Sequence, residues 1–128
     1  MKLVLDSSII IDYLRNGPIG VSFFEEKRKD DQFFLPTIVI FELFSGKSTN
    51  NSRIVKIIND FLHYFERITL TEVLANRAGK LYREVPQKLS VSDYLIAASA
   101  LEINGEVVTL NKKHFELIPS LKIYPIDE

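Results

Sequence analysis

A short apolar run at the start of the chain passes directly into a polar turn and then into a second apolar segment. The run is Leu3-Val4-Leu5, the turn is Asp6-Ser7-Ser8, and residues 9–14 follow. Continuous apolar strands are typical of parallel sheets that are covered on both faces. The junction therefore predicts a buried strand at 3–5 that leads at once into a helix at 7–15.

The same alternation continues along the chain. Further strands are expected at 33–35, 67–70, 107–109 and 121–124, and helices at 19–29, 37–46, 54–65, 74–85 and 91–104, with a short turn or helix at 112–117. Polar loops are expected at 47–52 and 86–90, and Gly105 is expected at the C′ position of the preceding helix. This order predicts a single α/β domain over residues 1–128, with a doubly wound, mainly parallel sheet of about five strands and helices on both faces.

Charge and cysteine content narrow the range of functions. The net charge of −1 gives no global positive field for nucleic acid, so a polyanionic substrate would need local cations or a bound metal. The absence of cysteine excludes disulfides, thiolate metal sites and cysteine nucleophiles. Asp6 and Asp12 interrupt the apolar N-terminal stretch, and no run approaches the ~18 apolar residues of a membrane span. We expect a cytoplasmic protein without a membrane segment.

Three acidic residues stand in unusually apolar surroundings. Asp6 follows the first strand, Glu42 lies within the helix expected at 37–46, and Asp93 lies in the first turn of the helix at 91–104. A doubly wound sheet brings such positions to the carboxyl edge of its strands, where ligands bind. Carboxylate oxygens suit Mg²⁺ or Mn²⁺, so the three acids are candidate ligands of a divalent cation.

Each acid also has a structural alternative. Asp6 is a good helix N-cap, and Asp93 follows serines and complements a helix dipole, which by itself is the more common role for an acid there. Glu42 is harder to explain in this way, because an unpaired buried carboxylate costs several kcal/mol. Lys47 is the basic residue that could reach back to Glu42. We favour a ligand role for Glu42, and the combination of the three acids favours function.

A second group of polar residues could assist. Asn111 comes just after the strand at 107–109 and could ligate a cation or hold a water, although asparagine is also common in turns. Lys112 and Lys113 could meet a phosphate, and a solvated turn would explain them equally well. Ser8 could orient Asp6 or contact substrate, although its position is also that of an ordinary helix-start serine.

Other polar residues and motifs give weaker signals. Asp12 is expected to be a solvated residue of the first helix. His63 and His114 are also expected to be solvated, since neither has a zinc-like partner at i+4. The chain contains no Gly-rich phosphate loop and no Gly-x-Ser-x-Gly elbow.

Four segments together resemble the motifs of PIN domains, in the order and spacing of VapC-type toxins from prokaryotic toxin–antitoxin pairs. They are Leu3-Val4-Leu5-Asp6-Ser7-Ser8, Ile40-Phe41-Glu42-Leu43, Ser92-Asp93-Tyr94-Leu95-Ile96-Ala97-Ala98 and Val108-Thr109-Leu110-Asn111-Lys112-Lys113-His114-Phe115. The resemblance covers the whole chain.

This resemblance implies a Mg²⁺- or Mn²⁺-dependent endoribonuclease, with RNA as substrate and a cognate antitoxin as partner. Asp6, Glu42 and Asp93 match the family's acids. Asn111 and His114 occupy the two places where the family has a fourth acid, so a second metal is in question. The antitoxin is expected to place a basic residue among the acids and apolar residues in a groove near Phe23, Phe24, Phe41 and Phe44. The nine phenylalanines further suggest a homodimer.

Three rival functions remain open from the sequence. A PIN nuclease of RNA processing would share all of these residues, and a relative that binds RNA or a partner without cutting would explain the missing fourth acid. A phospho-acceptor receiver domain is also doubly wound with clustered acids. That class needs a paired acid beside the first strand, where this chain has Ser7, and a lysine at a late strand end, where it has Thr109-Leu110.

Overall fold

Five parallel strands form one sheet in the computed structural model, which describes residues 1–26, 29–85 and 89–126. The order across the sheet is β3-β2-β1-β4-β5. The strands are β1 (Lys2–Leu5), β2 (Gln32–Pro36), β3 (Glu66–Ile68), β4 (Glu106–Val108) and β5 (Lys122–Ile123). The predicted α/β sheet is confirmed, and the strand boundaries differ from the expected ones by one or two residues.

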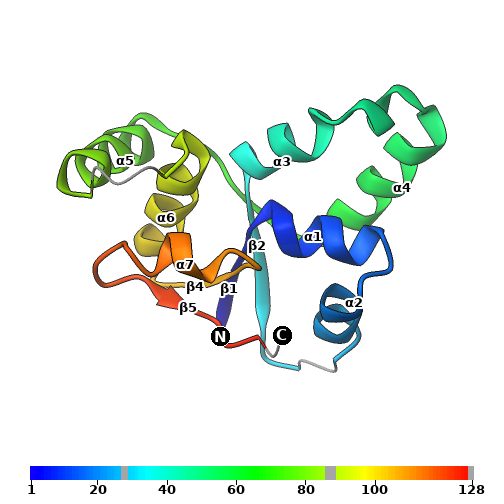
Figure 1. Cartoon of the computed structure of the whole chain (residues 1–128), viewed down its shortest axis with the longest axis horizontal. Helices are drawn as coiled ribbons and strands as arrows, with labels where there is room; N and C mark the ends of the chain where they lie inside the picture. The colour runs from blue at the N-terminus through cyan, green and yellow to red at the C-terminus, as the bar shows by residue number, and fades with distance from the viewer. Residues whose placement is uncertain (27–28, 86–88, 127–128) are drawn as a thin grey trace.

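Helices cover both faces of this sheet, as the sequence predicts (Figure 1). In the figure α5 and α6 lie on one side of the strands, and α1, α2 and α4 lie on the other. The helices are α1 (Ser7–Leu14), α2 (Pro18–Glu25), α3 (Thr37–Phe44), η1 (Lys47–Asn50, a 3₁₀ turn), α4 (Ser52–Leu62), α5 (Glu72–Glu84), α6 (Val91–Ile103) and α7 (Lys112–Phe115).

The direction of the chain across the sheet reverses next to β1. From β1 the chain steps to β2 and then to β3 on one side, and afterwards it returns to β4 on the other side of β1. Doubly wound sheets bind ligands at this switch point, outside the carboxyl ends of the strands. The carboxyl ends of β1 and β4 are therefore the place where a functional site is expected.

The core contains the central strands and one almost wholly buried helix. Leu3, Val4 and Leu5 of β1 are fully buried, as are Val107 and Val108 of β4. Helix α6 buries every residue from 96 to 100, which explains its alanine-rich sequence. On the opposite face, a cluster of aromatic rings joins α1, α2, β2 and α4, and it contains Tyr13, Phe23, Phe24, Phe33, Phe61 and Phe65.

Several local expectations need correction. Helix α2 ends at Glu25, earlier than the expected residue 29, and residues 27–28 lie outside the described part, as do residues 86–88 of the loop expected at 86–90. The loop expected at 47–52 contains the 3₁₀ turn η1. Gly105 follows the C-cap Asn104 of α6 and so takes the expected C′ position, but the left-handed residue is Asn104 and not Gly105. Gly105 is required for a different reason, since a Cβ there would lie 2.9 Å from Val4 Cγ2.

Asp12 is also not the solvated residue that its position predicts. Its Oδ2 accepts a hydrogen bond of 2.7 Å from the backbone N–H of Gly20 in α2. A Cβ at Gly20 would approach the backbone nitrogen of Tyr13 to 2.4 Å, so the two helices meet closely here. Asp12 therefore fixes the α1–α2 corner. His63, by contrast, is exposed as expected.

Among the described residues, no helix is both long and apolar enough to cross a membrane.

Candidate active site

Asp6 lies at the switch point, directly after the last residue of β1. Its backbone N–H continues the sheet by donating to the carbonyl of Val108 at 3.1 Å. The residue occupies the N-cap position of α1, but its side chain caps no backbone N–H. The capping role is therefore wrong, and the carboxylate is directed to other partners.

Two hydroxyl groups hold the Asp6 carboxylate. Thr109 donates to Asp6 Oδ2 at 2.7 Å, and Ser8 donates to the same oxygen at 2.8 Å. The two hydroxyls are 3.2 Å apart, and the backbone N–H of Leu110 donates to Ser8 Oγ at 3.0 Å. Ser8 therefore orients Asp6, which is one of the roles that the sequence suggests, and its hydroxyl is already engaged within the protein.

Thr109 is part of the candidate site, although the sequence did not single it out. It is fully buried just after β4, and its hydroxyl also accepts from the backbone N–H of Asn111 at 2.9 Å. The sequence could have indicated Thr109 by its position, because it follows β4 directly, just as Asp6 follows the neighbouring strand β1. Thr109 ties the two strand ends together at the acid.

Burial changes the protonation of Asp6. The side chain is 3% exposed, and this desolvation raises the pKa of Asp6 above its ordinary value of 3.8. The hydrogen bonds from Thr109 and Ser8 act in the opposite direction, and the charge of Asp93 adds to the rise. The site thus holds a carboxylate whose negative charge is only partly compensated by protein groups.

Glu42 approaches the same place from α3, which follows β2. Its pKa is raised first by burial and then by the charge of Asp6, with a smaller contribution from Asp93, while the hydroxyls of Ser7 and Ser92 lower it. Glu42 Oε1 is buried and accepts no hydrogen bond. No ion pair joins Glu42 to Lys47 among the described residues, so the structural alternative for this glutamate receives no support.

The helix around Glu42 is less buried than its apolar sequence predicts. Val39 and Leu43 face the core, whereas Phe41 is 67% exposed. An apolar sequence around an acid therefore does not show that the whole helix is buried. Glu42 itself is half-buried.

Asp93 has the capping role considered for it and also lies near the other two acids. In the first turn of α6 it forms a capping box, since Ser90 Oγ accepts from the backbone N–H of Asp93 at 3.2 Å and Asp93 Oδ2 accepts from the backbone N–H of Ser90 at 3.3 Å. The side chain is nevertheless close enough to Asp6 and Glu42 to raise the pKa of both carboxyl groups, as the weaker of the causes for each.

His114 is exposed, as expected, but its ring also lies beside an acid. Its Nδ1 lies 3.4 Å from Asp93 Oδ2, although 55% of the side chain remains exposed. Helix α7 thus brings this ring beside Asp93 at the start of α6. The sequence signal was its position in the fourth motif, where the resemblance implies an acid.

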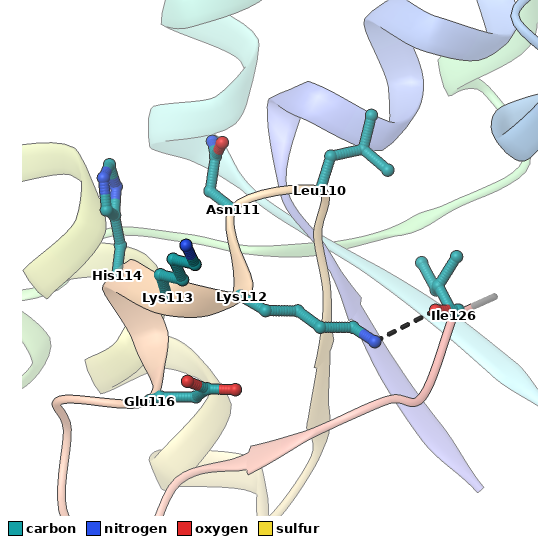
Figure 2. A pocket seen from close by; sticks show the side chains of 7 residues that line it. All are labelled: Leu110, Asn111, Lys112, Lys113, His114, Glu116 and Ile126. Atoms are coloured by element: carbon teal, nitrogen blue, oxygen red, sulfur yellow. Dashed lines mark hydrogen bonds between the residues drawn. The ribbon is translucent and has the colours of Figure 1, made fainter. Parts of the chain in front are cut away.

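The other residues expected around the fourth motif have different surroundings (Figure 2). Asn111 is exposed, and its side chain forms no cap on α7. Lys113 is exposed beside it, whereas Lys112 turns away and donates to the backbone carbonyl of Ile126 at 3.0 Å. Lys112 therefore anchors the C-terminal segment, and its expected contact with substrate stays a prediction.

The three acids thus share one edge of the sheet and influence each other's charge. Within the described residues, however, no three histidine or acidic side chains are arranged as a finished metal site. The residues fit a divalent cation by the chemistry of their side chains. Hard oxygen donors, uncompensated negative charge and the unpaired oxygen of Glu42 are what a divalent cation would satisfy.

An apolar pocket of about 350 Å³ opens beside Glu42, between α1, α3 and α4. Its wall is mainly aliphatic, and Glu42 and Arg15 are the charged residues in it. The aliphatic side chains are those of Ile11, Leu14, Leu43, Ile54, Ile57 and Ile58. None of Phe23, Phe24, Phe41 and Phe44, near which the antitoxin groove was expected, lines this pocket, and Phe23 and Phe24 are part of the aromatic cluster. A groove at those four residues stays a prediction.

Comparison with known proteins gives concordant results. The family model described as PIN domain matches residues 3–120. Ribonuclease VapC10 of Mycobacterium tuberculosis is 32% identical over 123 residues, covering 94% of this chain and 90% of the relative. Ribonuclease VapC of Rickettsia bellii is 32% identical over 137 residues, covering 98% of this chain and 97% of the relative. Among solved structures, a chain of VapBC2 from Rickettsia felis, bound to a DNA fragment from the promoter, has a TM-score of 0.85 and 26% identity over 99% of this chain and all of that one.

Proposed function

The chain belongs to the PIN domain family, and we propose that it is an endoribonuclease of the VapC type, the toxin of a toxin–antitoxin pair. The observation that carries this proposal is the 32% identity to VapC ribonucleases along almost the whole chain. The receiver-domain alternative is excluded by family membership. A protein with this activity would work on RNA in the cytoplasm.

We propose Asp6, Glu42 and Asp93 as the residues that would hold a divalent cation, Mg²⁺ or Mn²⁺. When bound, such an ion activates water and stabilises negative charge on a phosphodiester. Ser8 and Thr109 keep one oxygen of Asp6 fixed by donating to it, so they are positioning residues. The capping box fixes Asp93 at the start of a buried helix, which holds its carboxylate in one orientation.

Asn111 stands where the resemblance implies a fourth acid, and an amide supplies an oxygen without a charge. We propose that Asn111 contributes weakly to the cation site and that a single strongly held ion is used. Loss of one anionic ligand lowers metal affinity, so activity should need a higher metal concentration than it would with four acids.

The apolar pocket beside Glu42 supports an antitoxin partner. An amphipathic helix could lay apolar side chains against Ile54, Ile57 and Ile58, in the way that helices occupy hydrophobic grooves. An arginine on the same segment could then reach Glu42, whose Oε1 has no hydrogen-bond donor. Solved relatives of this chain are described as complexes of VapB and VapC proteins, and the proposal extends that assembly to this chain.

The nuclease is tested on total RNA, with and without Mg²⁺ or Mn²⁺, by mapping the new ends. Wild type should cut at defined positions only with metal, and Asp6→Asn should not cut. Metal-dependent cleavage by wild type and Asp6→Asn alike would point to a contaminating nuclease. Failure of clean wild type to cut would leave the protein as a binding relative.

The toxin role is tested in the native host by expression without neighbouring genes. Wild type should arrest growth and Asp6→Asn should not, and co-expression of the adjacent reading frame should restore growth. Ile57→Asp should resist this rescue while it keeps nuclease activity, because Ile57 lines the pocket and is half-exposed. Tyr64→Asp is the matched control, an exposed apolar position outside the pocket. Unimpaired growth with wild type at matched protein levels would favour a nuclease of RNA processing.

A further inference from the structure

A second pocket of about 490 Å³ lies beside α7, at the end of β4. Its volume is in the range of sites that bind small molecules. Leu110 and Ile126 provide apolar walls, and the polar groups are those of Asn111, Lys112, Lys113, His114 and Glu116 (Figure 2). A site of this size and mixed polarity suits a single nucleotide unit and not a duplex.

His114 connects this pocket to the candidate active site. The same imidazole that lines the pocket approaches Asp93 Oδ2 to 3.4 Å through Nδ1. In Figure 2 the side chains of Asn111, Lys113 and His114 rise on the same side of α7, whereas Lys112 reaches the other way to Ile126. A molecule in the pocket would therefore be separated from Asp93, one of the three acids, by the His114 ring.

Lys113 is the cation that remains available for a ligand. The ammonium group of Lys112 is occupied by the backbone carbonyl of Ile126. Lys113 forms no hydrogen bond or ion pair with any residue that the structure describes, and it lines the pocket. With Lys112 and Lys113 positive and Glu116 negative, the lining carries a formal charge of +1 apart from His114, which suits one phosphate.

We propose that this pocket binds the nucleotide that neighbours the scissile phosphodiester, with its phosphate paired to Lys113 and its sugar or base against Leu110 and Ile126. The inference rests on the proposed ribonuclease function and adds a subsite to it. Since the chain has a net charge of −1, local contacts of this kind are what can hold an RNA strand across the acids. Asn111 can hydrogen-bond a base edge, because its amide both donates and accepts.

The test measures binding of the four nucleoside 5′-monophosphates to the Glu42→Gln protein by calorimetry in EDTA. At least one nucleotide should bind, and Lys113→Gln in the same background should weaken its binding at least fivefold. Lys122→Gln is the matched control, an exposed lysine on β5 outside the pocket, and should leave binding unchanged. The proposal would be overturned by any of three results: no nucleotide binds, both variants lose binding equally, or inorganic phosphate binds as tightly as the nucleotides.

Steady-state cleavage of a single-stranded RNA distinguishes this proposal from the nuclease assignment. Lys113→Gln should raise KM at least fivefold with little change in kcat, and the salt dependence of binding should fall by about 0.7 in logarithmic slope, the contribution of one phosphate contact. If wild type binds the mononucleotide through Lys113 but does not cleave RNA, the subsite stands and the nuclease assignment fails. If wild type cleaves and Lys113→Gln has the same KM, the nuclease stands and the subsite is wrong.

Discussion

Replacement of Glu42 by glutamine should stabilise the metal-free protein. Glu42 Oε1 is buried without a hydrogen-bond donor, and the charges of Asp6 and Asp93 oppose its ionisation. An unsatisfied buried group costs more when it is charged than when it is neutral, and we take this difference as about 1 kcal/mol because the residue is only half-buried. Glutamine keeps the shape and removes the charge. For a domain of this size, that gain should raise Tm by roughly 4 °C.

The pH dependence of this effect has a definite sign. Because the folded-state pKa of Glu42 lies above its ordinary value of 4.5, the folded protein holds the proton more tightly than the unfolded chain. The cost of ionising Glu42 is therefore absent below about pH 4.5, grows as pH rises through the raised pKa, and is constant above it. The Tm difference between Glu42→Gln and wild type should follow the same course, from near zero at low pH to its full value at neutral pH.

Thermal unfolding in EDTA over a pH series measures this difference, and the addition of Mg²⁺ should reverse it. An ion at a hundred times its Kd stabilises the folded state by about 2.7 kcal/mol, and glutamine should remove most of that gain. The variant should then be more stable than wild type without metal and less stable with it. A lower Tm for Glu42→Gln in EDTA at neutral pH, or a difference that does not change with pH, would refute the reasoning about burial and repulsion.

Four further outcomes follow from the same structure. Asp6→Asn and Asp93→Asn should each abolish RNA cleavage with an unchanged circular dichroism spectrum, and near-wild-type turnover in either folded variant would remove that residue from the proposed ligand set. Asn111→Asp should tighten Mg²⁺ binding measured by calorimetry, since it restores a fourth anionic oxygen, and an unchanged affinity would show that residue 111 does not face the ion. Gly105→Ala should cost about 1–3 kcal/mol in denaturant unfolding, because its Cβ would lie 2.9 Å from Val4 Cγ2, and a neutral effect would mean that β1 and β4 can separate to admit it. Sedimentation at micromolar concentration should give twice the chain mass, and a monomer throughout would contradict the homodimer.

The architecture could be predicted from the sequence because it depends on local patterns. A continuous apolar run such as Leu3-Val4-Leu5 is typical of a strand that is covered on both faces. The spacing of Ile54, Ile58 and Leu62 is typical of a helix with one buried side. Alternation of such segments leaves few topologies other than a parallel sheet between helices. Once the sheet is fixed, its carboxyl edge is fixed too, which is why Asp6, Glu42 and Asp93 could be named together.

Tertiary structure decided which side chains meet. Thr109 reaches Asp6 across 103 positions of sequence, and His114 reaches Asp93 from a helix of four residues. Likewise, Phe41 is exposed although its neighbours are apolar, and Lys112 anchors the C-terminal segment while Lys113 faces the pocket. Hydrophobic periodicity indicates which face of a helix or strand is buried. It does not show which elements that are distant in sequence pack together, and this packing brings the side chains of the site into contact.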